Sequence, residues 1–217
     1  MALNFNIEPF YDDYSEDKQF YRILFRPGYA VQARELTQLQ TILQQQVKRH
    51  GDHIFKNGAM VIPGQVSYDS KTAYVKLKPE ISSSSIVKTF SVLSSTIGKL
   101  YKGQTSGVEA LVLTATPAEV IGGVSEPDTL FVKYTRGSGK FTENEIISPV
   151  DGSSGLDLVV QANDAFGLGT TASIEKGVYY IKDNFVLVQA QTIVLSKYSG
   201  DATAKAGLKV IEEIRYP

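Results

Sequence analysis

The chain has 217 residues, with 22 basic and 23 acidic side chains, two His and no Cys. A hydrophobic fraction of 42% is enough for a packed core and excludes global disorder. The formal net charge of -1 gives no general attraction to nucleic acid or to an anionic membrane surface. The absence of Cys excludes a disulfide framework and Cys-ligated zinc. No apolar run approaches the roughly 20 residues that a membrane-spanning helix needs, and a signal peptide is not expected at the start.

The chain changes character near residue 57, and residues 1–57 form the first of three expected parts. The run 20–25 is apolar apart from Arg22, which predicts a short buried strand or a segment that docks on a partner. Arg26-Pro27-Gly28 ends this run, because Pro fixes φ and Gly readily takes a positive φ in a tight turn. This part is therefore expected to hold a docking segment followed by a helix.

The helix is predicted over about residues 32–50, because nearly all residues there are good helix formers and Gly51 is a natural stop. Its apolar positions are Leu36, Leu39, Ile42, Leu43 and Val47, and His50 continues the face. Spacings of three or four residues form one narrow stripe along Leu36, Leu39, Leu43, Val47 and His50. A helix in a domain core usually shows about three apolar positions in seven. So thin a stripe favours a coiled-coil-like seam between chains. The alternative is that the helix lies on the sheet of its own domain.

The second expected part is a discontinuous antiparallel β-domain formed by residues 58–93 and 172–217. Strands are predicted at residues 58–64, 73–78, 86–93 and 191–198, from short apolar or alternating runs bounded by turn-forming residues. Residues 177–181 and 185–188 flank Lys182-Asp183-Asn184, which predicts a hairpin with Asp and Asn in its turn.

The third expected part, residues 94–171, lies between the two halves of the second. Five short strands are predicted at residues 99–102, 108–114, 129–135, 145–148 and 156–161, with glycine-containing breakers between them. Their near-regular spacing suggests a small closed β-barrel or a sandwich, inserted into the discontinuous domain. The expected fold class is mainly β with an N-terminal α-helix.

No motif in the sequence predicts catalysis, a cofactor or a bound metal. His50 and His53 lack a local third ligand, so packing and capping at the helix end is their expected role. Three copies of His50 could, however, meet around a threefold axis and bind a metal or an anion. Glu143 and Glu145 are expected on the solvated surface. Residues 167–172 fit G-x-G-x-x-A, but they do not lie between a strand and a helix, as a dinucleotide site requires.

Several stretches of the N-terminal region resemble a family of tailed-bacteriophage virion proteins, which is common in cyanophages and other phages with contractile tails (myoviruses). These stretches are residues 9–14, 16–18, 24–40, 51–55 and 58–64. Residues 177–195 resemble the central hairpin of the same family. Residues 103–108, 129–132 and 139–142 resemble a small β-barrel module of phage tail proteins. Larger members continue past the segment matching residues 207–214, so this chain is expected to be a fibre adaptor or a short tail fibre.

The resemblance implies a structural protein of the virion, made in the host cytoplasm and located at the tail baseplate or fibre, with a role in viral tail assembly and host attachment. The implied partners are further copies of the chain in a homotrimer, baseplate wedge proteins and a distal tail-fibre protein. Burial of the helix stripe between three chains predicts an oligomer interface of Leu36, Leu39, Leu43, Gln46, Val47 and His50. Baseplate docking is expected at Phe10, Tyr11, Phe20, Phe25 and Arg26. No enzyme activity, cofactor, nucleic acid or membrane insertion is expected.

The alternative function is a carbohydrate-binding module of a receptor-binding fibre, in which the inserted barrel contacts host surface glycan. Exposed aromatic side chains such as Tyr101 or Tyr134 would then stack on sugar rings. A glycan-degrading enzyme is the least favoured class, because depolymerase fibres usually carry long repetitive β-helical regions and this chain has no such repeat.

Overall fold

The fold is known from a computed structural model that describes residues 5–81, 84–87, 90–121, 123–153, 156–200 and 202–213. The chain is mainly β, with one long helix and a large antiparallel sheet. It groups into two compact units: Met1–Gln65 with Glu175–Gln189, and Val66–Ile174 with Ala190–Pro217. The division into three domains expected from the sequence stays a prediction, since a compact unit in space need not coincide with a domain of the chain.

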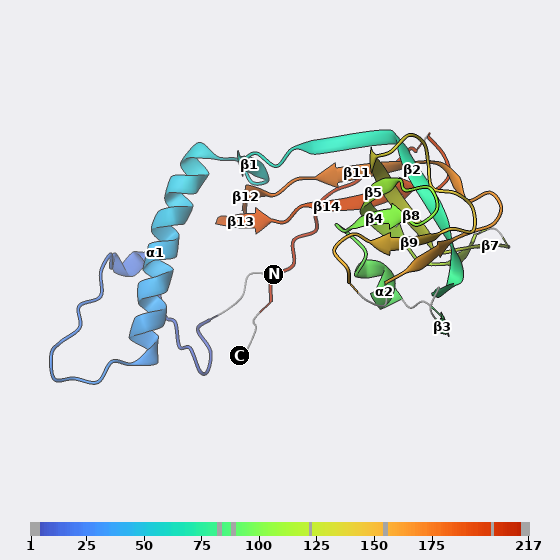
Figure 1. Ribbon diagram of the computed structural model, residues 1–217. Coiled ribbons are helices and arrows are strands. Elements are labelled where there is room, and N and C mark those ends of the chain that lie inside the picture. Colours follow the sequence, from blue (N-terminus) through green and yellow to red (C-terminus); the bar gives the residue numbers. More distant parts are fainter. Residues whose placement is uncertain are drawn as a thin grey trace. The chain divides into compact units, whose positions relative to one another are not determined.

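The first unit combines the long helix with a small sheet (Figure 1). Its elements are η1 (Glu16–Lys18), α1 (Ala33–Ile54), β1 (Ala59–Ile62), β12 (Gly177–Ile181) and β13 (Asn184–Val188). The three strands pair antiparallel in the order β1-β12-β13. Segments more than a hundred residues apart in the sequence therefore share one sheet.

The predicted hairpin is confirmed as β12 and β13. Ile181 pairs with Asn184, so Lys182 and Asp183 form a two-residue turn. Both turn residues have positive φ, at 46° and 68°. This is the requirement of a type I′ turn, whose twist matches that of the flanking strands.

Helix α1 begins close to its predicted start but runs past its predicted end. The side chain of Glu35 accepts a hydrogen bond from the backbone N of Gln32 at 3.0 Å, which satisfies one of the free donors of the first turn. The prediction that Gly51 ends the helix is wrong, because the helix continues to Ile54. Gly51 is buried there, and a Cβ atom on it would lie 2.6 Å from Cζ of Tyr180. Close approach to a neighbouring ring therefore explains this glycine.

The second unit contains the large sheet. Its strands are β2 (Val66–Ile81), β3 (Ser84–Val87), β4 (Leu100–Gly103), β5 (Glu109–Thr116), β8 (Thr129–Arg136), β9 (Ile146–Pro149), β10 (Leu158–Val160), β11 (Phe166–Ile174) and β14 (Gln191–Ser196). The strands follow one another in the order β10-β9-β4-β5-β8-β2-β11-β14, and β3 pairs with β2. A further pairing of β10 with β2 returns the path to its start. A separate two-stranded sheet joins β6 (Glu119–Ile121) and β7 (Val124–Glu126).

The core of the second unit lies on the inner face of these strands. Buried side chains alternate along β4, β5, β9 and β10, as expected for strands with one face on a core. The largest of the buried core residues are Leu77, Leu93, Tyr101, Leu130, Phe141, Ile147 and Leu158. All five strands predicted between residues 94 and 171 exist, as β4, β5, β8, β9 and β10, with ends that differ by up to two residues in most cases.

Two predicted features of the β-rich region are wrong or incomplete. Residues 86–93 do not form one strand: β3 ends at Val87, and a short helix, α2 (Phe90–Ser94), follows. Strand β11 was not predicted, because Gly167 and Gly169 interrupt its apolar pattern. Both glycines have a packing reason, since a Cβ on Gly169 would lie 2.8 Å from the ring of Phe131 and 2.9 Å from the carbonyl oxygen of Ser196. These close approaches could not be seen from the sequence.

Candidate docking and oligomerisation surfaces

One face of α1 is an exposed apolar strip. Its large side chains keep about half of their surface exposed: Leu36 51%, Leu43 58%, Val47 46% and Ile54 54%. Their spacings of seven, four and seven residues place all four on one line along the helix. A large exposed apolar surface is typical of an interaction site.

The predicted oligomer interface coincides with this strip. Leu36, Leu43, Gln46, Val47 and His50 are exposed, and Leu39 is half-buried. Ile54 was missed, because the helix was expected to end at Gly51. That these residues meet other chains stays a prediction.

The opposite face of α1 is contacted by the N-terminal segment of its own unit. Ile42 is 4% exposed and lies on this covered face. The N-terminal segment is held there by polar contacts: Thr41 donates a hydrogen bond to Asp12 at 2.5 Å, and Gln38 donates one to Asp13. Glu16 forms an ion pair with Arg49 at 3.0 Å. The helix thus meets its own unit through Ile42 and several polar side chains, while the apolar strip stays exposed.

The end of α1 is fastened to the small sheet through Tyr180 of β12. Its hydroxyl donates a hydrogen bond to Asp52 at 2.8 Å and lies 3.2 Å from the carbonyl oxygen of Lys48. Burial of the phenol, together with the neighbouring Asp52 carboxylate, raises the pKa of Tyr180 to about 12. Lys48 forms an ion pair with Asp183 in the hairpin turn at 2.6 Å, which raises the pKa of its ammonium group. The predicted hairpin therefore positions the helix.

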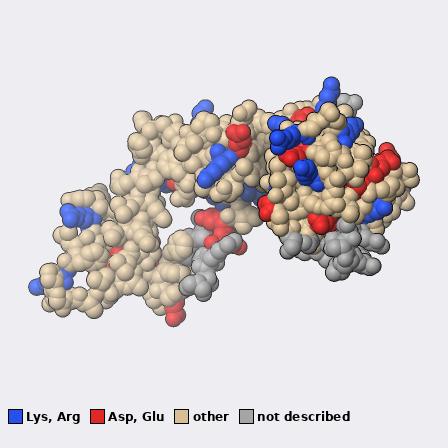
Figure 2. Space-filling view, in the orientation of Figure 1, with Lys and Arg blue, Asp and Glu red and all other residues tan. Residues whose placement is uncertain are grey.

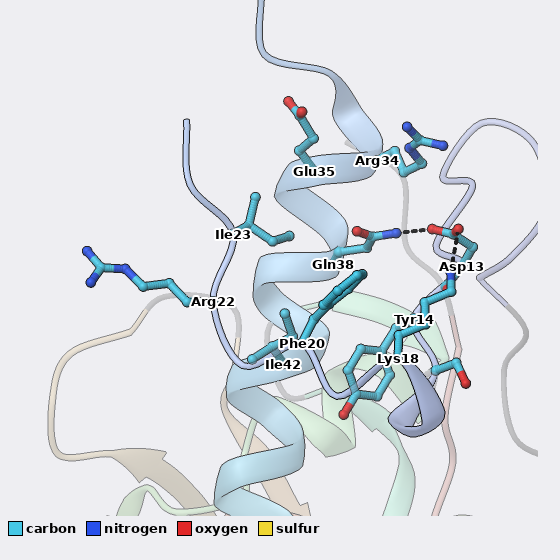
Figure 3. A pocket seen from close by; sticks show the side chains of 11 residues that line it. Asp13, Tyr14, Lys18, Phe20, Arg22, Ile23, Arg34, Glu35, Gln38 and Ile42 are labelled. Carbon is cyan, nitrogen blue, oxygen red and sulfur yellow. Dashed lines mark hydrogen bonds and ion pairs between the residues drawn. The ribbon is translucent and has the colours of Figure 1, made fainter. Parts of the chain in front are cut away.

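A pocket of about 370 Å³ lies between α1 and the N-terminal segment (Figure 3). Phe20, Ile23 and Ile42 supply its apolar wall, and Gln38 and Asp13 meet at its side. Lys18 donates a hydrogen bond to Asp13 at 2.8 Å, and this contact lowers the pKa of the Asp13 carboxyl group.

The predicted docking residues lie on or near this N-terminal segment. Tyr11, Phe20 and Phe25 are 52%, 63% and 45% exposed, Arg26 is exposed, and Phe10 is half-buried. The sequence prediction missed further exposed side chains of the same segment: Tyr21 at 82%, Leu24 at 77% and Tyr29 at 67%. The guanidinium of Arg26 lies 4.9 Å from the centre of the Tyr29 ring, a cation–π contact across the turn at Gly28. Residues 20–31 thus expose an extended apolar segment with arginines between its apolar side chains.

Charge is mixed over the face of the molecule seen in Figure 2, where lysine and arginine are interspersed with aspartate and glutamate. The segment from Lys18 to Arg34 differs locally, because it contains four cations and no carboxylate. None of the helices in the described ranges combines the length and the apolar character that crossing a bilayer requires.

Two sequence expectations about chemistry are wrong. Tyr101 is fully buried, and its hydroxyl donates a hydrogen bond to the carbonyl oxygen of Leu156 at 3.1 Å, so it cannot stack on a glycan. Glu145 is only 4% exposed and is not a surface carboxylate, whereas Glu143 is exposed as expected. A single carboxylate in a short β-rich run carries no sequence signal of burial.

Comparison with known protein families finds a match over part of the chain. Residues 8–100 match the family described as Domain of unknown function (DUF4815). The matched stretch contains the docking segment, α1, β1 and β2, and all the predicted interface and docking residues fall within it. Comparison with curated proteins and with solved structures returned no match.

Proposed function

We propose that this chain is a structural virion protein of a tailed phage, which attaches a tail fibre to the baseplate as a fibre adaptor or a short tail fibre. It acts by trimeric assembly through α1 and not by catalysis. The observation that carries the proposal is the exposed apolar strip on α1, on the side of the helix that its own unit leaves uncovered. The resemblance of residues 9–64 to phage tail proteins supplies the biological setting.

The strip has the character of a coiled-coil seam. Because about half of each side chain is still exposed, covering Leu36, Leu43, Val47 and Ile54 would stabilise an assembly by about 1 kcal/mol for each residue. Three parallel helices would bury three copies of the strip against one another, and closed cyclic symmetry would limit the assembly to a defined size. His50, on the line of the strip, would supply a polar layer that favours one register, and Gln46 would flank the seam.

The exposed segment 20–31 suits the second task, which is docking on the baseplate. Its aromatic and aliphatic side chains offer apolar contact area, and Arg22 and Arg26 add positive charge without a carboxylate nearby in the sequence. The partner surface, on a baseplate wedge protein, is therefore expected to be apolar with acidic side chains around it. The β-rich second unit would hold the distal fibre protein.

The path of strand pairing that returns from β10 to β2 supports a small barrel in the second unit. Six strands take part in the order β2-β8-β5-β4-β9-β10. We interpret this ring as a small barrel made of the five strands expected in the inserted module, residues 94–171, together with β2, which the sequence analysis placed outside that module. Closure of this kind leaves no free edge on the strands that take part only in the ring, which suits a protein at high local concentration in a particle.

Light scattering over a dilution series tests the assembly step. The wild-type chain should show about three times the monomer mass, and Leu43→Asp with Val47→Asp should reduce it to the monomer, since burying carboxylates in the seam is costly. Val120→Asp is the matched control: Val120 is 71% exposed on β6, so the same change there should leave the mass unaltered. A wild-type monomer at every concentration contradicts the trimer.

The docking step is tested in phage particles. Phage carrying Phe25→Asp should lack the protein in their tails, as measured by mass spectrometry of purified particles.

Saccharide binding is the second candidate, and a groove of about 370 Å³ in the second unit favours it. The groove lies where β2 continues beyond its last pairing with β8. Paired hydroxyls line it, Thr72 with Thr171 at 2.7 Å and Ser67 with Ser173 at 2.6 Å. Its other lining residues include two cations, Lys71 and Lys133, and one carboxylate, Asp69, so the excess of positive charge suits an acidic sugar.

Calorimetry with oligogalacturonate and with a neutral malto-oligosaccharide tests this candidate. Binding of the acidic sugar alone, reduced at least tenfold by Lys71→Ala with Lys133→Ala, would support it. Absence of binding to both sugars would count against it and leave the structural role untouched.

A further inference from the structure

His50 lies inside α1 and not at its end. The helix continues to Ile54, so a full turn follows this residue and the expected role in helix-end capping does not apply. His50 is exposed, on the same side of the helix as the apolar strip. Together with the strip it completes a line in which spacings of four and three residues alternate: Leu36, Gln40, Leu43, Val47, His50 and Ile54. This alternation is the pattern of the two core positions of a heptad repeat.

In a parallel trimer built on this seam, each core position forms a layer of three identical side chains. The His50 layer would lie between an apolar layer of Val47 and an apolar layer of Ile54. Helix axes in such bundles lie about 8–10 Å apart, which places each axis about 5–6 Å from the threefold axis. Since Cα atoms lie about 2.3 Å from their helix axis, an imidazole on the inner side can reach the centre. Three imidazole nitrogens can then converge on one point.

We infer that the trimer binds a divalent cation of the zinc type on its threefold axis, through one imidazole nitrogen of each His50. The inference rests on the proposed trimer. Three imidazoles are an established ligand set for zinc, with metal–nitrogen distances of about 2.0–2.1 Å and a fourth position open to water or an anion. The described part of one chain contains no group of three His, Cys, Asp or Glu side chains that could hold a metal. The site is therefore incomplete in the monomer and exists only in the assembly.

The charges around His50 permit a cation there. The two preceding residues are basic, but both are paired: Lys48 with Asp183 at 2.6 Å and Arg49 with Glu16 at 3.0 Å. Positive charge near the layer is thus already compensated within the unit. His53 lies three residues further on, which rotates it about 60° away from His50 around the helix. It falls outside the seam and is a suitable control.

The experiment titrates the full-length chain with Co²⁺ and then with Zn²⁺, after light scattering has given the mass of each protein. The wild type is expected to bind one Co²⁺ for three chains, to show the visible absorption of tetrahedral cobalt, and to lose it when Zn²⁺ displaces Co²⁺. His50→Leu should keep the trimer mass, because it turns the layer apolar, and should lose the absorption completely. His53→Asn should retain both the absorption and the stoichiometry.

Each other outcome overturns the inference. If the wild type is a trimer that binds no metal in this ratio, the metal site is contradicted and the proposed function is not. If the wild-type chain is monomeric at every concentration, both the metal site and the proposed trimer are contradicted. Absorption that persists in His50→Leu, or that disappears equally in His53→Asn, assigns the metal to other imidazole or carboxylate groups on the surface.

Discussion

Replacing Glu145 by Ala is expected to lower the free energy of unfolding by about 3–5 kcal/mol, a large part of the stability of a domain of this size. Glu145 is buried, and its carboxylate accepts four hydrogen bonds. Oε2 accepts from the backbone N of Thr105 at 3.1 Å and of Ser106 at 2.9 Å. Oε1 accepts from the hydroxyl of Ser106 at 2.9 Å and from the backbone N of Thr142 at 2.5 Å. One side chain thus joins the turn after β4 to the turn before β9.

The size of the expected effect follows from the donors that would remain. Ala would leave three backbone N–H groups of part-buried hydrogen bonds without acceptors. Each such group costs up to about 1–3 kcal/mol, although the costs do not add fully. Gln would also destabilise the fold, because its amide N–H₂ would face donors. Urea unfolding followed by circular dichroism measures both variants. Glu143→Ala is the control, since Glu143 is exposed two residues away and should change stability by less than about 0.5 kcal/mol. An equal loss in both variants would show that the carboxylate contacts are not the cause.

The protein is expected to unfold cooperatively as the pH rises from 10 toward 12. Burial raises the pKa of Tyr134 to about 12 and that of Tyr101 still further, and it also raises the pKa of Tyr74 and Tyr198. All four lie in the second unit. In the unfolded chain a tyrosine ionises near pH 10. The folded state therefore holds protons that the unfolded state has released.

The direction of the effect follows from proton linkage. A raised pKa in the folded state means that the contribution to stability is complete below pH 10 and is lost as the pH rises above it. Tyr101 and Tyr134 together would lower the free energy of unfolding by at most about 2.7 kcal/mol for each pH unit between 10 and 12, and by less where solvent screens the phenolate of Tyr134. Tyrosinate absorbance and circular dichroism should change together at one midpoint.

A variant pair distinguishes this mechanism from general alkaline damage. Tyr134→Phe should move the midpoint of alkaline unfolding to higher pH, because the variant lacks one buried phenol whose ionisation favours the unfolded state. Tyr21→Phe, at a side chain 82% exposed in the N-terminal segment, should leave the midpoint unchanged. A midpoint that is the same in the wild type and in Tyr134→Phe would contradict the linkage.

The elements that could be predicted are those in which local sequence and fold agree. The β12–β13 hairpin follows from apolar runs on both sides of a polar turn, and α1 follows from a long run of good helix formers. The short strands of the second unit follow from apolar runs between glycines. The apolar strip on α1 was also visible, because its periodicity depends on the helix alone and not on what surrounds it.

The predictions that were wrong concern residues whose surroundings depend on contacts between distant segments. Gly51 is a helix stop by local rules, yet it is held within α1 by the nearby ring of Tyr180, which lies 129 residues later in the chain. Glu145 is charged and was expected in solvent, but backbone donors from a turn about 40 residues earlier surround it. Tyr101 was expected to be exposed, but it is part of the core.

The sequence by itself determined the mainly β class, the long helix with its narrow apolar stripe, and the hairpin, because each depends on the periodicity and turn chemistry of neighbouring residues. Only the tertiary structure decided which side of α1 is covered, where the helix ends, which carboxylate is buried and how the strands join. Those outcomes depend on side chains brought together from far apart in the chain, and burial and hydrogen bonding there outweigh local preference. The exposed strip depends on both the sequence and the tertiary structure. Its residues are periodic in the sequence, and the N-terminal segment of its unit packs on the opposite face of the helix.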